Sequence, residues 1–130
     1  MKPGILVVED NQLNRELLCD WLEVEGYEVC PAADLKASYE VFSKRLPDAV
    51  LLDINLGKDN GLDLLAWMRQ KPETREIPVL AVTAHALVTE QEQMLQAGCR
   101  GCLSKPINFE SLREQLNRCL QDRTVSRPNS

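Results

Sequence analysis

Residues 51–61 read LLDINLGKDNG, an apolar run that stops at Asp53 and continues in polar residues and glycines. A short, continuous apolar run bounded by turn residues is typical of a strand that is buried on both faces. Burying a carboxylate without a partner is costly, so the acidic residue at the end of this strand needs a reason. We therefore expect Asp53 at the edge of a sheet, at a site that requires its charge.

The flanking sequence alternates apolar segments with longer amphipathic ones. Strict alternation with short connections predicts a parallel sheet with helices on both faces, which is an α/β fold. Asn11, Asp34 and Asn108 suit the starts of helices, and Gly26 and Gly98 suit helix ends. The predicted strands are residues 4–8, 27–30, 49–52, 79–82 and 102–104.

The helices and loops carry three further expectations. The segment 72–78, PETREIP, is predicted to be an irregular loop. The large apolar residues of the helices, including Leu13 and Leu17, are assigned to the core. The folded domain is expected to span residues 1–122, followed by a polar tail at residues 123–130.

The chain has 130 residues and a formal net charge of −5. An acidic balance of this kind argues against direct nucleic-acid binding, which needs a basic surface. No apolar stretch approaches the roughly 18 residues of a membrane span, and the N-terminus lacks the features of a signal peptide. We therefore expect a cytoplasmic protein that binds neither nucleic acid nor membranes.

Cysteines are present in an odd number, and Cys99 and Cys102 form a CxxC pair. A structural zinc site needs a second pair of ligands, and the sequence contains no second CxxC and no HxxxH. The pair also follows a predicted helix end at Gly98, whereas a redox CxxC lies between a strand and a helix start. We expect reduced, partly buried thiols.

The carboxyl ends of parallel strands meet at one edge of a sheet, so the residues that follow the strands are expected together. Three of them are carboxylates, which repel one another unless a cation compensates them. Magnesium prefers oxygen ligands, Lys105 suits a phosphoryl oxygen, and Thr83 supplies a hydroxyl donor. This inventory suits phosphoryl transfer to a carboxylate. The residues are Glu9, Asp10, Asp53, Asn55, Thr83, Ala84, His85, Ser104, Lys105 and Pro106.

Four segments occur in the order of a known family: VVEDN at residues 7–11, LLDINL at 51–56, AVTAHAL at 81–87 and LSKPI at 103–107. Together they resemble the receiver domains of two-component response regulators, from Ile5 to the region of Leu120. The sequences of the first and third segments are most similar to those of receivers in hybrid kinases and phosphorelays. The resemblance implies a chemotaxis-regulator-like, flavodoxin-like (βα)5 fold, in which three layers surround a parallel sheet with strand order 2-1-3-4-5.

The resemblance also implies roles for the site residues. Asp53 is the phosphoacceptor, and Thr83 and Lys105 contact the phosphoryl group. The Lys105–Pro106 peptide bond is cis. The implied metal is Mg²⁺ or Mn²⁺, and the implied ligands are Asp10, Asp53 and the backbone carbonyl of Asn55, with Glu9 acting through water.

Two positions depart from the family pattern. Most receivers carry proline where this chain has Gly57, so the loop after the phosphoacceptor is expected to be more mobile. An aromatic residue that reports phosphorylation to the neighbouring helices is replaced by Cys102, so we expect that coupling to be weakened or carried differently. His85 is either a solvated loop residue or a control on water access to the acyl phosphate. Ala84 and Pro106 are expected to modulate the same pocket.

The family takes its phosphoryl group from a sensor or hybrid histidine kinase, or from a histidine phosphotransfer protein, and signals to a downstream protein. We therefore expect a switch, and not an enzyme, that assists only its own phosphorylation and dephosphorylation. A small phosphatase that uses an aspartyl phosphate is disfavoured, because Asn55 stands at the position of its acid–base group and cannot transfer a proton. The remaining alternative is a pseudo-receiver, an interaction module that works without phosphorylation.

Overall fold

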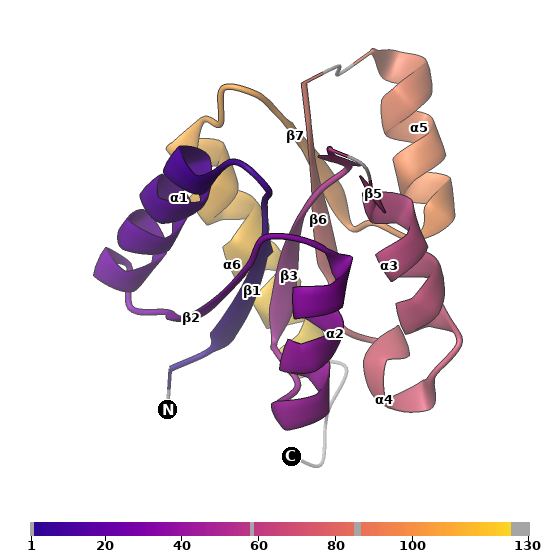
Figure 1. Cartoon of the computed structure of the whole chain (residues 1–130). Coiled ribbons are helices and arrows are strands. Elements are labelled where there is room, and N and C mark those ends of the chain that lie inside the picture. Colours follow the sequence, from indigo (N-terminus) through magenta and orange to yellow (C-terminus); the bar gives the residue numbers. More distant parts are fainter. Residues whose placement is uncertain (1, 58, 85–86, 126–130) are drawn as a thin grey trace.

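A computed structural model describes residues 2–57, 59–84 and 87–125 (Figure 1). Its centre is a five-stranded parallel sheet in the order β2-β1-β3-β6-β7. This order confirms the expected 2-1-3-4-5 arrangement, because β6 and β7 are the fourth and fifth strands of the sheet. The strands are β1 (Gly4–Val8), β2 (Glu28–Ala32), β3 (Ala49–Asp53), β6 (Val79–Thr83) and β7 (Gly101–Ser104).

Helices cover both faces of the sheet and complete a three-layer, flavodoxin-like architecture (Figure 1). On one face, α1 and α6 pack through residues such as Leu22 and Leu116. On the other face, α2, α3 and α5 contribute Phe42, Leu64 and Met94 to a second core. The helices are α1 (Gln12–Val24), α2 (Leu35–Lys44), α3 (Gly61–Arg69), α4 (Pro72–Arg75), α5 (Val88–Ala97) and α6 (Phe109–Val125).

The predicted helix caps are confirmed by their hydrogen bonds. Asn11 Oδ1 accepts from the amide of Asn14, and Asp34 Oδ1 accepts from the amide of Ala37. Asn108 caps α6 in the same way. Each cap satisfies an amide that the first turn of a helix leaves without a partner. Gly98 ends α5 with φ of 113°, a left-handed conformation that favours glycine.

A short hairpin follows β3 at the carboxyl edge of the sheet. Its strands are β4 (Asn55–Leu56) and β5 (Asp59–Asn60), which pair in an antiparallel arrangement. Gly57 lies between them with φ of 58°, a value that proline cannot adopt. The departure from the family's proline therefore coincides with a left-handed glycine beside a short antiparallel pair, and the higher mobility of the loop stays a prediction.

Two other segments differ from expectation. Pro72–Arg75 forms the single helical turn α4 inside the predicted loop, with proline in its first turn, where it is tolerated. The buried Thr74 hydroxyl donates to the carbonyl of Met68 at 2.6 Å and fixes this turn against α3. The last helix continues to Val125, beyond the expected domain limit at residue 122, since no glycine or proline interrupts the sequence before Pro128.

The assignment of Leu13 and Leu17 to the core is wrong. Their exposed fractions are 76% and 58%, whereas Leu18 and Leu22 are buried. Consecutive helical residues lie about 100° apart around the axis, so Leu13 and Leu17 are turned away from the pair that faces the sheet. α1 therefore presents an apolar strip to solvent.

Candidate functional site

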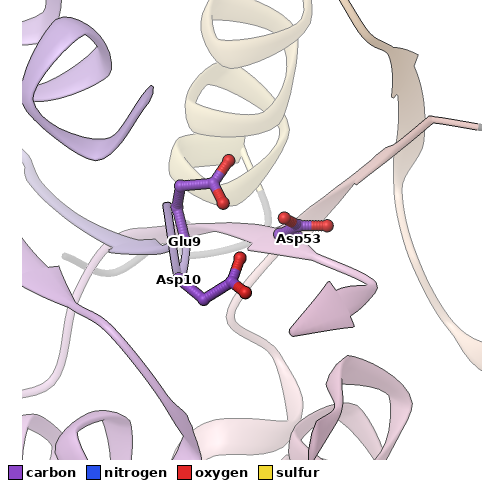
Figure 2. A group of neighbouring side chains, drawn as sticks. All are labelled: Glu9, Asp10 and Asp53. Atoms are coloured by element: carbon purple, nitrogen blue, oxygen red, sulfur yellow. The ribbon is translucent and has the colours of Figure 1, made fainter. Parts of the chain in front are cut away.

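The acidic residues predicted to converge do so at the carboxyl edge of the sheet. Glu9 and Asp10 follow β1, and Asp53 ends β3, which is the neighbour of β1 (Figure 2). One carboxylate oxygen from each of the three residues lies within 4.8 Å of the other two. Glu9 and Asp53 are buried and Asp10 is exposed, so the cluster opens to solvent on the Asp10 side.

Both carboxylate oxygens of Asp53 have partners. Oδ1 accepts from the amide of Asn55 at 2.9 Å, and Oδ2 accepts from Lys105 Nζ at 2.8 Å. Lys105 Nζ also lies 3.3 Å from Glu9 Oε1, so one ammonium group bridges two buried carboxylates. The amide of Lys105 donates to the carbonyl of Thr83 and aligns the end of β7 with that of β6.

Glu9 is held from three directions. Its side chain accepts from the amide of Asn11 at 3.1 Å, its own amide donates to the carbonyl of Ala32, and its carbonyl accepts from Arg15 Nη1. Burial raises the pKa of Glu9 from 4.5 to about 7, and the hydrogen bond and negative charge of Asp53 act in the same direction. Glu9 is therefore poised between its two protonation states near neutrality.

Lys105 keeps its proton firmly. Burial lowers its pKa, but the hydrogen bond and charge of Asp53, with a contribution from Glu9, outweigh burial and leave the pKa raised. Among the described residues, Lys105 is the only cation within salt-bridge distance of the cluster. One ammonium facing three carboxylates leaves an excess of negative charge. That excess and the all-oxygen donor set fit a hard divalent cation such as magnesium.

The remaining predicted residues are placed as follows. Thr83 is buried at the end of β6, which pairs with β3 beside Asp53. Ala84 follows it and is exposed. The Lys105–Pro106 bond is cis, as the family resemblance implies. His85 lies outside the described residues, and the metal role of the Asn55 carbonyl stays a prediction.

A pocket of about 230 Å³ adjoins the cluster between α1 and the start of α6. Sequence reasoning missed it, because it assigned Leu17 to the core. The exposed strip of α1 forms part of its wall and continues onto the open surface. The lining residues are Glu9, Asn14, Leu17, Leu18, Lys105, Pro106, Ile107 and Phe109.

Gly61 supports Asp53 through the backbone. A Cβ at this position would lie 2.5 Å from the carbonyl oxygen of Asp53 and 2.9 Å from the Cα of Ile54. The amide of Gly61 also donates to the carbonyl of Ile54. The start of α3 therefore packs directly on the chain that carries the central carboxylate, and only glycine fits there without a shift of the backbone.

Cys102 packs toward α5 and away from the acidic cluster. Its Sγ lies 3.6 Å from Sδ of the buried Met94, and the half-buried Cys102 side chain packs against the core on that face of the sheet. Burial raises the pKa of Cys102, and burial raises that of Cys99 to about 12. None of the five cysteines, all of which lie within the described residues, forms a disulfide. Both CxxC thiols are therefore poorly ionised and poorly nucleophilic at neutral pH.

The raised pKa of Glu9 makes stability depend on pH. Between pH 4.5 and about 7 the folded protein holds a proton on Glu9 that the unfolded chain releases. The contribution of Glu9 to the free energy of unfolding should therefore be largest at the acidic end of this window and decline as pH rises through it. Urea denaturation of metal-free protein on either side of the window measures this contribution.

Two variants isolate the effect of Glu9. Glu9→Gln removes the titration and should be more stable than wild type above the window, whereas Glu23→Gln, at an exposed position of α1, should follow the wild-type curve. An equal pH dependence in wild type and Glu9→Gln would contradict the assignment.

Comparisons with known proteins agree on one family. The family model of the response regulator receiver domain matches residues 5–117. The polar-differentiation response regulator DivK of Brucella anthropi is 35% identical over 122 residues, which cover 94% of this chain and 99% of the relative. No helix among the described residues is long and apolar enough to cross a membrane.

Solved structures give the same result. The chemotaxis response regulator CheY4 of Vibrio cholerae superposes with a TM-score of 0.85 at 27% identity, covering 92% of this chain and 100% of that one. The receiver domain of a sensor histidine kinase from Pseudomonas aeruginosa PAO1 gives 0.83 at 31% identity, covering 93% and 99%. That structure holds a magnesium ion coordinated in its active site cleft.

Proposed function

Because the chain belongs to the receiver domain family of response regulators, we propose that Asp53 accepts a phosphoryl group from a phosphohistidine and that the modified domain changes its protein contacts. The observation that carries the proposal is the buried carboxylate of Asp53, with one oxygen bound to the Asn55 amide and the other to Lys105. Intact mass after incubation with magnesium and acetyl phosphate tests it.

The proposed step is a direct displacement at phosphorus. A carboxylate oxygen of Asp53 forms the new P–O bond while the P–N bond to the donor imidazole breaks, and the imidazole leaves with the electron pair. The Lys105 ammonium, 2.8 Å from the carboxylate, is placed to neutralise a phosphoryl oxygen, and the Thr83 hydroxyl is a candidate donor to another. Hydrolysis of the resulting acyl phosphate returns the domain to its starting state.

Glu9, Asp10 and Asp53 are the residues that would hold Mg²⁺ or Mn²⁺, together with the backbone carbonyl of Asn55. The excess negative charge of the cluster supports this assignment, and so does the magnesium in the Pseudomonas receiver. A divalent cation bound there would neutralise charge on the phosphoryl oxygens. Lys105 and the raised pKa of Glu9 offset part of the negative charge of the cluster.

We further propose that the chain is a switch that acts only on itself, in the cytoplasm, between a histidine kinase or histidine phosphotransfer protein and a downstream protein. One observation favours the pseudo-receiver alternative. Cys102 replaces the aromatic residue that the family resemblance leads us to expect, and its half-buried thiol packs on Met94 at the margin of the core. If the domain were a pseudo-receiver, it would fail to bind magnesium as well as fail to accept phosphate.

The exposed strip of α1 is proposed to contact the phosphohistidine donor. A donor that reaches Asp53 must cover the rim of the site, and Leu17 lines the same pocket as Glu9 and Lys105. Leu17→Asp should slow transfer from a phosphorylated histidine phosphotransfer protein about tenfold, because it places a charge in an apolar contact. Phosphorylation by acetyl phosphate, which needs no docking surface, should stay unchanged. Rapid-quench transfer assays with both donors measure the ratio.

The matched control for this prediction is Val24→Asp, at the far end of α1. Val24 is 84% exposed and does not line the pocket. An equal loss of rate with both donors in Leu17→Asp would indicate damage to the phosphorylation site itself. An equally slow transfer to Val24→Asp would indicate that the added negative charge, and not the position on α1, causes the loss. Either result would remove the docking role of this surface.

A further inference from the structure

The β4–β5 hairpin is fixed at both of its ends. At the start, the amide of Asn55 donates to Asp53 Oδ1 at 2.9 Å. At the end, Asn60 Oδ1 accepts from the amide of Leu62 and caps α3 at 3.0 Å. Between them, Leu56 is buried in the core beneath the hairpin. The hairpin is therefore attached to the site at both ends and anchored in the core by Leu56.

A third attachment joins the hairpin to a distant part of the chain. Asp59 Oδ2 accepts a hydrogen bond from the amide of Leu35, the first residue of α2, at 3.3 Å. The amides of a first helical turn have no partner within the helix, so an acceptor oxygen placed there satisfies one of them. α2 already has its own cap in Asp34, which binds the amide of Ala37. Asp59 is thus a second carboxylate at the same helix end, contributed by the hairpin.

The hairpin also lies against the exposed member of the acidic cluster. A Cβ at Gly57 would approach Asp10 Oδ2 to 3.2 Å, so the main chain of Gly57 passes directly beside that carboxylate. Asp10 is the only one of the three acidic residues that is exposed. Movement of the hairpin would therefore displace the main chain of Gly57 that packs beside Asp10. It would also displace the Asn55 amide that donates to Asp53.

From these contacts we propose that Asp59 is a positioning residue for the metal and phosphoryl site. By holding the hairpin on the N-terminus of α2, it keeps Gly57 beside Asp10 and the Asn55 amide on Asp53. Among the described residues no hydrogen bond or ion pair joins Asp59 to the acidic cluster, so Asp59 acts through the hairpin. The proposal rests on the function proposed above, since it concerns how the same site is kept in shape.

The test compares magnesium affinity in three variants of the full chain. Asp59→Ala removes the attachment and should weaken magnesium binding by the unphosphorylated protein about tenfold, a typical effect for a residue that orients a ligand from outside the ligand shell. Asp59→Asn keeps an acceptor oxygen and should restore most of the affinity. Asp34→Ala removes the neighbouring cap of the same helix, so it should lower stability without changing magnesium affinity. Isothermal titration with MgCl₂ gives the affinities, and urea denaturation gives the stabilities.

The variants distinguish a positioning role of Asp59 from a helix-capping role and from an effect of its charge. Equal affinity in Asp59→Ala and Asp34→Ala would reduce Asp59 to a helix cap and overturn the proposal. Equal weakening in Asp59→Asn and Asp59→Ala would assign the effect to lost charge and would overturn it as well. If wild type neither bound magnesium nor accepted phosphate, the proposed function itself would fail. Normal wild-type behaviour with an unaffected Asp59→Ala would reject the positioning role alone.

Discussion

The Asp53→Asn variant is expected to gain no mass on incubation with magnesium and acetyl phosphate, while the wild-type chain gains one phosphoryl group. An amide oxygen is a poor nucleophile, and its product would not be a stable acyl phosphate. The substitution should preserve the fold, because the amide oxygen can take the place of Oδ1 and accept from the Asn55 amide, while only the contact of Oδ2 with Lys105 is lost. Intact-protein mass spectrometry measures the difference directly.

Asp63→Asn is the matched control. Asp63 is an exposed carboxylate in the first turn of α3, near Asp53 in sequence but outside the cluster. It should be phosphorylated like wild type. A full gain of mass in Asp53→Asn would place the acceptor elsewhere. No gain in wild type that still binds magnesium would require a phosphohistidine protein as donor, and no gain without magnesium binding would favour the pseudo-receiver.

The Lys105→Ala variant is expected to be phosphorylated about 100-fold more slowly than wild type, a loss typical of removing one preorganised charge from a transition state. Lys105 is the ammonium that contacts both Asp53 and Glu9. Its loss should also raise the pKa of Glu9 above its value of about 7, since the charge of Lys105 lowers that pKa in the intact site. Mass measured over time gives the rate, and carboxyl ¹³C shifts followed against pH give the pKa.

Lys71→Ala controls for the loss of a lysine in general. Lys71 Nζ lies 4.4 Å from the ring centroid of Trp67 and lines a separate pocket between α2 and α4. Its removal should leave both the rate and the pKa of Glu9 unchanged. A normal rate in Lys105→Ala would refute the transition-state role, and a fall in the pKa of Glu9 would contradict the charge balance described for the cluster.

The parallel sheet could be predicted from sequence because its three central strands, β1, β3 and β6, are buried on both faces. Such strands appear as uninterrupted apolar runs, and each run ends where a polar residue reaches the edge of the sheet. The caps at Asn11, Asp34 and Asn108 were predictable for a local reason: a side chain three residues from an amide can satisfy it without help from the rest of the fold.

The segments that were predicted wrongly depend on tertiary contacts. Leu13 and Leu17 have the spacing of core residues, but the sheet contacts only the neighbouring stripe of α1. The turn α4 is held by the hydroxyl of Thr74 on Met68, a contact that propensity does not reveal. The strands β4 and β5 have two residues each, too few to show any period.

The composition of the site could be predicted, but its internal contacts could not. The order of strands brings Glu9, Asp10 and Asp53 to one edge whatever their side chains do. The sequence does not show that Lys105 bridges Asp53 and Glu9, or that burial shifts Glu9 toward neutrality. These features depend on distances of a few ångströms and on the amount of water excluded, which follow only from the packed structure.

Gly61 has a consequence for how tolerance to substitution should be read in this chain. The missing side chain leaves room for the main chain of Asp53, and any replacement would push against that main chain. In a saturation-mutagenesis map scored by phosphorylation, position 61 should therefore appear as intolerant as position 53, although glycine offers no reactive group. Intolerance at the two positions would have different origins, clearance in one case and chemistry in the other. A map scored by folding alone would separate them, since Asp53→Asn should pass and Gly61→Val should fail.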